Sequence, residues 1–179
     1  MTALGTEAPD FSLSDVRTGG AVNLSDVTGD KGVLVMFICS HCPFVVHVQA
    51  QLAQLGKDYA SSGVGIVAIC SNDETVSPSD SLANLKAQAE AQGFTFPYLR
   101  DDSQDVARAY DAACTPDFFL YGADRKLLYR GQLDSARPSN EVEVNGVDLR
   151  AALDTVIAGG APGGEQTASM GCNIKWRDG

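Results

Sequence analysis

The sequence predicts an α/β domain in which a central mixed β-sheet is flanked by helices. Two uninterrupted apolar runs, over 33–38 and 64–70, are typical of strands buried on both faces of a sheet. A stretch with apolar residues at helical spacing follows the first run, as expected for parallel strands joined by helices. Two later apolar runs flank a turn over 122–125, which adds an antiparallel edge to the predicted sheet.

The first sixty residues predict a hairpin, a strand and a long helix. Residues 10–14 and 21–25 alternate apolar and polar side chains about a Thr-Gly-Gly turn, so we expect an N-terminal β-hairpin extension. The run over 33–38 is the first buried strand. Apolar residues from Phe44 to Tyr59 then recur at helical spacing and predict one amphipathic helix.

The remainder of the chain continues the alternation of strands and helices and closes with a helix. Gly93 is a typical helix stop after the second helix. In chain order we expect a buried strand over 64–70, a helix over 82–92, a short strand over 96–99, a short helix over 104–110, hairpin strands over 117–121 and 127–130, and a last helix over 147–158.

Length and charge restrict the classes of protein that the chain can belong to. Its 179 residues suffice for one domain with an ample core, which we assign to 1–158. The segment 159–179 begins with a Gly- and Pro-rich linker and is expected to end in a docking tail. With 13 basic and 23 acidic residues, the net charge of −10 argues against nucleic acid or an anionic membrane as a partner. The sequence shows no secretory or membrane-spanning pattern, so we expect a cytoplasmic protein.

The motif that most directly indicates chemistry is Cys39-x-x-Cys42, between the first buried strand and the first helix. Two thiols at this spacing can close a small disulfide, and a single CxxC in an α/β protein is typical of a redox pair. The helix N-terminus and the imidazole of His41 both favour thiolate over thiol. Pro43 fits best in the first helical turn, which places Cys42 close to the N-cap. We therefore expect Cys39, Cys42 and His41 to be catalytic, with the Cys39–Cys42 disulfide as the redox group and no metal or other cofactor.

The order of the motifs resembles the thioredoxin-like superfamily, in its peroxiredoxin-like (AhpC/TSA-type, thiol-disulfide reductase-like) group. Residues 4–15, with the pattern Leu-Gly-x-x-Ala-Pro-Asp-Phe-x-Leu-x-Asp, are similar to the opening of that group. The CxxC motif stands where the thioredoxin motif stands. Thr115-Pro116 and the hairpin over 117–131 are similar to the cis-proline strand and hairpin of the superfamily. The resemblance covers residues 4 to about 158.

This resemblance implies a thioredoxin-like fold with an N-terminal hairpin extension and a C-terminal tail. It also implies a cis peptide bond before Pro116, and a substrate-binding role in which the backbone of Thr115 pairs with an extended client segment. The implied function is thiol-disulfide exchange with protein or low-molecular-weight partners. The oligomeric state is left open.

Peroxide reduction is an alternative that the motif does not favour. Typical peroxiredoxins place threonine or serine three residues before the reactive cysteine and proline seven residues before it. Measured from Cys42, these positions hold Cys39 and Val35; measured from Cys39, they hold Met36 and Gly32. Neither cysteine therefore has the companions of a typical peroxidatic cysteine, and antioxidant activity stays a second choice.

The position of the motif suggests a role for each thiol. We expect Cys39, at the exposed edge of the strand-to-helix junction, to attack the disulfide of the partner. Cys42, one turn further and more buried, would then resolve the mixed disulfide. Cys114 lies two residues before Pro116, and Cys172 lies in the tail, so both are possible additional redox thiols.

Two further classes remain open. A metal-binding protein could combine Cys39 and Cys42 with Cys114 or Cys172 and a histidine, either His41 or His47, because zinc and copper prefer thiolate and imidazole. A thioredoxin-like domain without catalysis could serve for binding alone, although the intact CxxC argues against it.

Overall fold

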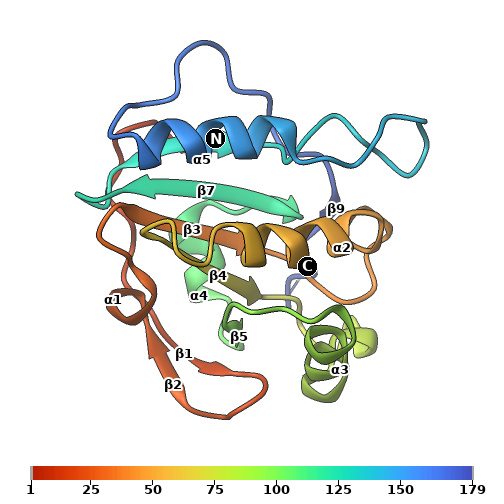
Figure 1. Cartoon of the computed structure of the whole chain (residues 1–179). Coiled ribbons are helices and arrows are strands. Elements are labelled where there is room, and N and C mark those ends of the chain that lie inside the picture. Colours follow the sequence, from red (N-terminus) through yellow and green to blue (C-terminus); the bar gives the residue numbers. More distant parts are fainter. Residues whose placement is uncertain (1, 179) are drawn as a thin grey trace.

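The computed structural model describes residues 2–178, and within them seven strands form one mixed sheet in the order β2-β1-β5-β4-β3-β7-β8 (Figure 1). The sheet strands are β1 (Ser12–Asp15), β2 (Ala21–Asn23), β3 (Gly32–Phe37), β4 (Val64–Cys70), β5 (Tyr98–Arg100), β7 (Asp117–Gly122) and β8 (Leu127–Gly131). The helices are α1 (Leu24–Val27), α2 (Pro43–Asp58), α3 (Leu82–Gln92), α4 (Asp105–Tyr110) and α5 (Val147–Ile157), with a 3-10 turn η1 (Pro78–Asp80). A separate two-stranded sheet joins β6 (Cys114–Thr115) to β9 (Cys172–Asn173).

The central strand β3 fixes the layers of the molecule. It runs parallel to β4 and antiparallel to β7, and every residue of the strand is buried. Alternate side chains enter two separate cores, because successive residues of a strand point to opposite faces. Leu34 and Met36 pack with α2, α3 and α5, whereas Val33, Val35 and Phe37 pack with α1 and α4. The fold is therefore a three-layer α/β sandwich, as the sequence predicts.

Two predicted elements differ from the structure. Residues from Leu24 leave the hairpin and form the short helix α1, because Asp26 accepts a hydrogen bond from the backbone N–H of Asn23 in a capping box. The strand expected over 96–99 begins later, at Tyr98. The carbonyls of Phe94 and Phe96 instead accept hydrogen bonds from the guanidinium of Arg17, so they are not available to a strand ladder.

The C-terminal tail folds back on the domain. Strand β9 pairs antiparallel with β6, so that Cys172 lies opposite Thr115. Figure 1 shows β9 beside the first turn of α2. The strand approaches closely because residue 171 is glycine: a Cβ atom there would lie 1.9 Å from the carbonyl oxygen of Thr115. The tail thereby covers the end of the sheet at which β3 meets α2.

Beyond β9 the tail is anchored by a buried side chain and by contacts with the loop that follows β4. Ile174 is buried in the core that contains α4, and the carbonyl of Lys175 accepts a hydrogen bond of 2.9 Å from the backbone N–H of Asp73. Arg177 forms an ion pair with Asp73 at 2.5 Å. These anchors hold the tail in place independently of Cys172. Within residues 2–178, no helix is both long and apolar enough to span a bilayer.

Candidate active site

The CxxC motif lies at the N-terminus of α2. Cys42 is the N-cap residue and Pro43 is the first helical residue, as the sequence predicts. Because the first N–H groups of a helix have no partner within the helix, a sulfur atom at this place meets hydrogen-bond donors and the positive end of the helix dipole. All five cysteines are free thiols.

Thr115 connects the two thiols of the motif. The Cys39 Sγ lies 3.4 Å from the Oγ1 of Thr115, and the Cys42 Sγ lies 3.4 Å from the carbonyl oxygen of Thr115. The peptide bond between Thr115 and Pro116 is cis. Residues 73 or more positions apart in the sequence are thus brought into contact at the end of the sheet.

The expectation that Cys39 is the exposed thiol and Cys42 the buried one is wrong. Both side chains have a relative exposure of 0%. The physical reason is the covering of the site: β6 packs over both sulfur atoms, and the tail strand β9 lies on β6. A sequence pattern that places a cysteine at a strand-to-helix junction does not show which distant segment covers it.

The two thiols also differ in acidity in the direction opposite to the one expected. The hydrogen bond from the Cys39 thiol, opposed by burial and assisted by hydrogen bonds from Cys172, lowers the pKa of Cys42 to about 4. The same hydrogen bond to Cys42, together with burial, raises the pKa of Cys39 far above its ordinary value. These directions favour ionisation of Cys42 over ionisation of Cys39.

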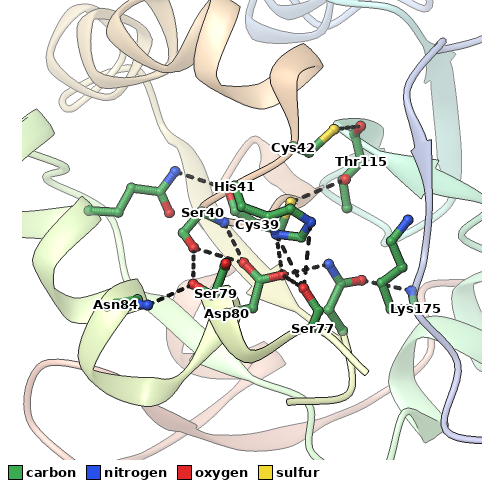
Figure 2. A network of polar contacts seen from close by, with 12 residues as sticks. Cys39, Ser40, His41, Cys42, Ser77, Ser79, Asp80, Asn84, Thr115 and Lys175 are labelled. Carbon is green, nitrogen blue, oxygen red and sulfur yellow. Dashed lines mark hydrogen bonds and ion pairs between the residues drawn. The ribbon is translucent and has the colours of Figure 1, made fainter. Parts of the chain in front are cut away.

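A buried carboxylate supports the loop that carries the motif. Asp80 accepts hydrogen bonds from Ser40 N–H at 2.8 Å, from Asn72 at 2.9 Å and from Ser77 at 2.9 Å. Its Oδ2 atom lies 2.7 Å from the Nδ1 of His41 (Figure 2). Burial opposes ionisation of Asp80, but these hydrogen bonds hold its pKa below the usual value. Asp80 thus fixes the orientation of the His41 imidazole.

Asp80 and Gln88 are site residues that the sequence did not reveal. Gln88 donates to the carbonyl of Cys39 at 3.0 Å, and its own amide oxygen accepts from the hydroxyl of Tyr98 at 2.9 Å. Both residues come from the segment between β4 and β5, about 40 to 50 positions from the motif. Only a helix cap at Ser81 marks this region in the sequence, and a cap carries no information about a distant partner.

The other candidate residues separate into those near the motif and those away from it. The Cys172 thiol is hydrogen-bonded to the thiol of Cys42. Cys114 is buried beside Pro116, and burial raises its pKa to about 12. Burial likewise raises the pKa of Cys70 to about 12, as expected for a core cysteine. His47 is exposed on α2 and does not join the site.

The ligand atoms of Cys39, His41 and Asp80 lie within 4.8 Å of one another, which is close enough to hold a metal ion. Their chemistry does not favour one. The carboxylate of Asp80 already accepts from Ser40, Asn72 and Ser77, so a metal would have to replace hydrogen bonds in a buried site.

Purified without chelator, the reduced protein is expected to carry well below one zinc ion per chain, because the Asp80 carboxylate is committed to protein donors. Elemental analysis and thermal unfolding with and without EDTA measure this, with His41→Ala as the control variant. Stoichiometric zinc that is lost in His41→Ala, with a lower Tm after chelation, would instead establish a metal centre.

A sheet of this topology with two reduced thiols at the start of α2 defines the class of thioredoxin-like thiol-disulfide oxidoreductases. Its thioredoxin-like fold is shared with the thioredoxin domain of a thiol-disulfide oxidoreductase from Bacteroides vulgatus, at a TM-score of 0.63 and 19% identity over 84% of this chain and 98% of that chain. Residues 4–130 match the AhpC/TSA family, and the chain belongs to this family.

The chain is similar to a curated thiol-disulfide oxidoreductase and to an uncharacterised protein of known structure. The thiol-disulfide oxidoreductase ResA of Geobacillus thermodenitrificans is 32% identical over 125 residues, which are 70% of this chain and 67% of the relative. A crystal structure of an uncharacterised conserved protein from Geobacillus kaustophilus is 50% identical with a TM-score of 0.97, and the match covers 100% of this chain and 95% of that chain.

Proposed function

We propose that this chain exchanges disulfides with protein or low-molecular-weight partners, with the Cys42 thiolate as the attacking group and Cys39 as the resolving thiol. The observation that supports the proposal is the position of Cys42 at the N-cap of α2, where the Cys39 thiol donates a hydrogen bond to it. A thiolate is the nucleophile in disulfide exchange, and a neighbouring thiol is the group that releases the product.

The cycle follows from this arrangement. Cys42 attacks one sulfur of the partner's disulfide, and the other sulfur leaves as a thiolate. Cys39 then attacks the Sγ of Cys42, releases the partner's second thiol and closes the Cys39–Cys42 disulfide. Cys39 must lose a proton in the second step. The proposed base is the imidazole of His41, which precedes Cys42 in the sequence and lies 2.7 Å from Asp80.

Thr115 and Pro116 are the proposed contacts for a client segment. The backbone of Thr115 is the edge on which an extended peptide could pair as an added strand. Strand β9 lies on this edge in the structure, with Cys172 opposite Thr115. Entry of a client therefore requires that β9 move away from β6.

A trapping experiment tests the roles of the two thiols. The variants are Cys39→Ser/Cys172→Ser and Cys42→Ser/Cys172→Ser; Cys172 is replaced in both because its thiol also touches Cys42. After reaction with an aromatic disulfide whose released thiol is coloured, the first variant should keep a stable mixed disulfide at Cys42. The second variant should form much less adduct, since burial and the neighbouring Asp80 carboxylate still raise the pKa of the remaining Cys39. Intact mass and peptide mapping measure both.

Adduct formation at Cys39 in the second variant, at a rate equal to or above that of the first, would contradict the assignment of Cys42 as nucleophile.

Peroxide reduction is the second candidate, favoured by the thiolate at a helix N-terminus in a member of the AhpC/TSA family. Rapid and saturable peroxide consumption by the wild type, with no adduct in either variant, would place that activity first.

A further inference from the structure

The tail strand β9 places a third thiol at the active site. Cys172 is opposite Thr115 in the register of the β6–β9 pair, and Thr115 is the residue whose carbonyl contacts the Cys42 thiol. The side chain of Cys172 packs against the core cluster that contains Cys39 and Cys42. Cys42 and Cys172 are 130 positions apart in the sequence, and both lie beside Thr115, the residue before the cis proline.

Cys172 also interacts with the sulfur atom of Cys42. The Cys172 thiol donates to the Cys42 sulfur, and the backbone N–H of Cys172 donates to the same atom. The Cys172 sulfur accepts in turn from the backbone N–H of Phe44 in the first turn of α2. The Cys42 sulfur thus interacts with two thiols, that of Cys39 and that of Cys172.

Anchoring of the tail does not need a thiol at position 172. Ile174, Lys175 and Arg177 hold the tail through a buried side chain, a 2.9 Å hydrogen bond and a 2.5 Å ion pair. Gly171 removes the side chain that would keep the strand away from Thr115. The contacts therefore hold a cysteine against the nucleophile, where a small apolar residue would serve for packing alone.

We propose that Cys172 is a third exchanging thiol, which forms a disulfide with Cys42 once the protein has been oxidised by a partner. This proposal rests on the proposed function, which supplies the Cys39–Cys42 disulfide. The Cys172 thiolate attacks the Sγ of Cys42, the bond between Cys42 and Cys39 breaks, and Cys39 leaves as a thiolate that takes up the proton lost by Cys172. The step exchanges one disulfide for another and needs no external oxidant.

The new bond would fix β9 on the backbone of Thr115, where a client segment is proposed to pair. While Cys42 and Cys172 are joined, the backbone of Thr115 stays paired with the tail and no extended peptide can replace it. Reduction of this disulfide frees the nucleophile and removes the covalent bond that holds β9 on Thr115, so that β9 can move aside for a client. The Cys42–Cys172 disulfide is thus a resting form of the oxidised protein that is closed to further clients.

The test compares wild type with the variants Cys39→Ser and Cys172→Ser and with the control Cys70→Ala. Each protein is oxidised with glutathione disulfide, and its disulfides are then mapped by mass spectrometry without reduction. Cys39→Ser should form the Cys42–Cys172 disulfide in at least about tenfold excess over glutathione adduct at Cys42, because the internal thiol has a high effective concentration. Cys172→Ser should form Cys39–Cys42 alone, and Cys70→Ala should match the wild type. Adding Gly171→Val to Cys39→Ser should abolish the excess, because a side chain at 171 meets the Thr115 carbonyl.

Two negative outcomes are distinguishable. A wild type that forms Cys39–Cys42, together with a Cys39→Ser variant that carries only glutathione at Cys42, would overturn the role of Cys172 and leave the proposed function intact. Failure of wild type and Cys172→Ser to form Cys39–Cys42 would overturn the proposed function itself. An equal yield of Cys42–Cys172 with and without Gly171→Val would show that β9 pairing is not what brings the thiols together.

Discussion

At pH 6 the reduced protein is expected to carry one thiolate, at Cys42, in nearly every molecule. A pKa of about 4 leaves Cys42 almost fully ionised at that pH, whereas an ordinary thiol with a pKa of about 8.5 is ionised to roughly 0.3%, a difference of about 300-fold. The measurement is the ultraviolet absorbance of the thiolate as a function of pH. It needs no reagent to enter the site, which matters because Cys42 is completely buried.

Variants assign this titration. Cys42→Ser should remove the acidic step, and Cys39→Ser should move it to higher pH, because the Cys39 thiol is the main donor to the Cys42 sulfur. Cys70→Ala is the matched control and should leave the step in place. An acidic step that survives in Cys42→Ser and disappears in Cys39→Ser would show that the thiolate is at Cys39.

The lowered pKa also predicts how stability depends on pH. A group whose pKa is depressed in the folded state stabilises that state fully above its unfolded value, here about 8.5, and progressively less as the pH falls through the folded value. The reduced wild type should therefore lose stability relative to Cys42→Ser between about pH 8.5 and pH 4.

Replacing Asp80 by Asn is expected to lower the free energy of unfolding by about 3 kcal/mol, the largest loss among single substitutions at the site. The hydrogen bonds to a buried charge are lost, and the NH2 group of the new amide faces groups that are themselves hydrogen-bond donors. The carboxylate accepts from Ser40, Asn72 and Ser77 and faces His41. An amide of the same shape can replace only part of these acceptors. Urea unfolding of the reduced protein at pH 7 measures the effect.

Asp102→Asn is the control, because the Asp102 side chain is 81% exposed and its two ion pairs are 3.9 Å long. It should change the free energy of unfolding by less than about 0.5 kcal/mol.

The pKa of Asp80 is lowered, so the contribution of Asp80 to the free energy of unfolding is complete above about pH 4 and declines as the pH falls further. Equal stability of Asp80→Asn and wild type at pH 7, or an unchanged difference at pH 3, would contradict the role of the carboxylate.

The fold was largely predictable because its elements are defined by local patterns. The buried strand at 64–70 and the helix at 82–92 occur at the predicted residues. The cysteine at the N-cap of α2 was also predictable, because Pro43 restricts where the helix can begin. Each of these inferences uses neighbours in the sequence.

The chemistry within the site was less predictable because it depends on contacts between distant segments. Asp80 and Gln88 reach the motif from the β4–β5 connection, and no spacing links them to Cys39. The sequence suggested a tail that docks, but not that its strand would pair in register with β6. Without that cover, Cys39 would be expected at the surface, and this is why the expected difference in exposure between the two thiols is absent.

A sulfenic acid formed at Cys42 would be short-lived, because the thiols of Cys39 and Cys172 both touch the Cys42 sulfur. Condensation with either thiol releases water and gives a disulfide that a reductant can restore, whereas further oxidation to sulfinic or sulfonic acid is in general irreversible. Two adjacent thiols and a buried position leave little time or access for a second oxidising molecule. We therefore expect the packing around Cys42 to limit irreversible oxidation of this cysteine.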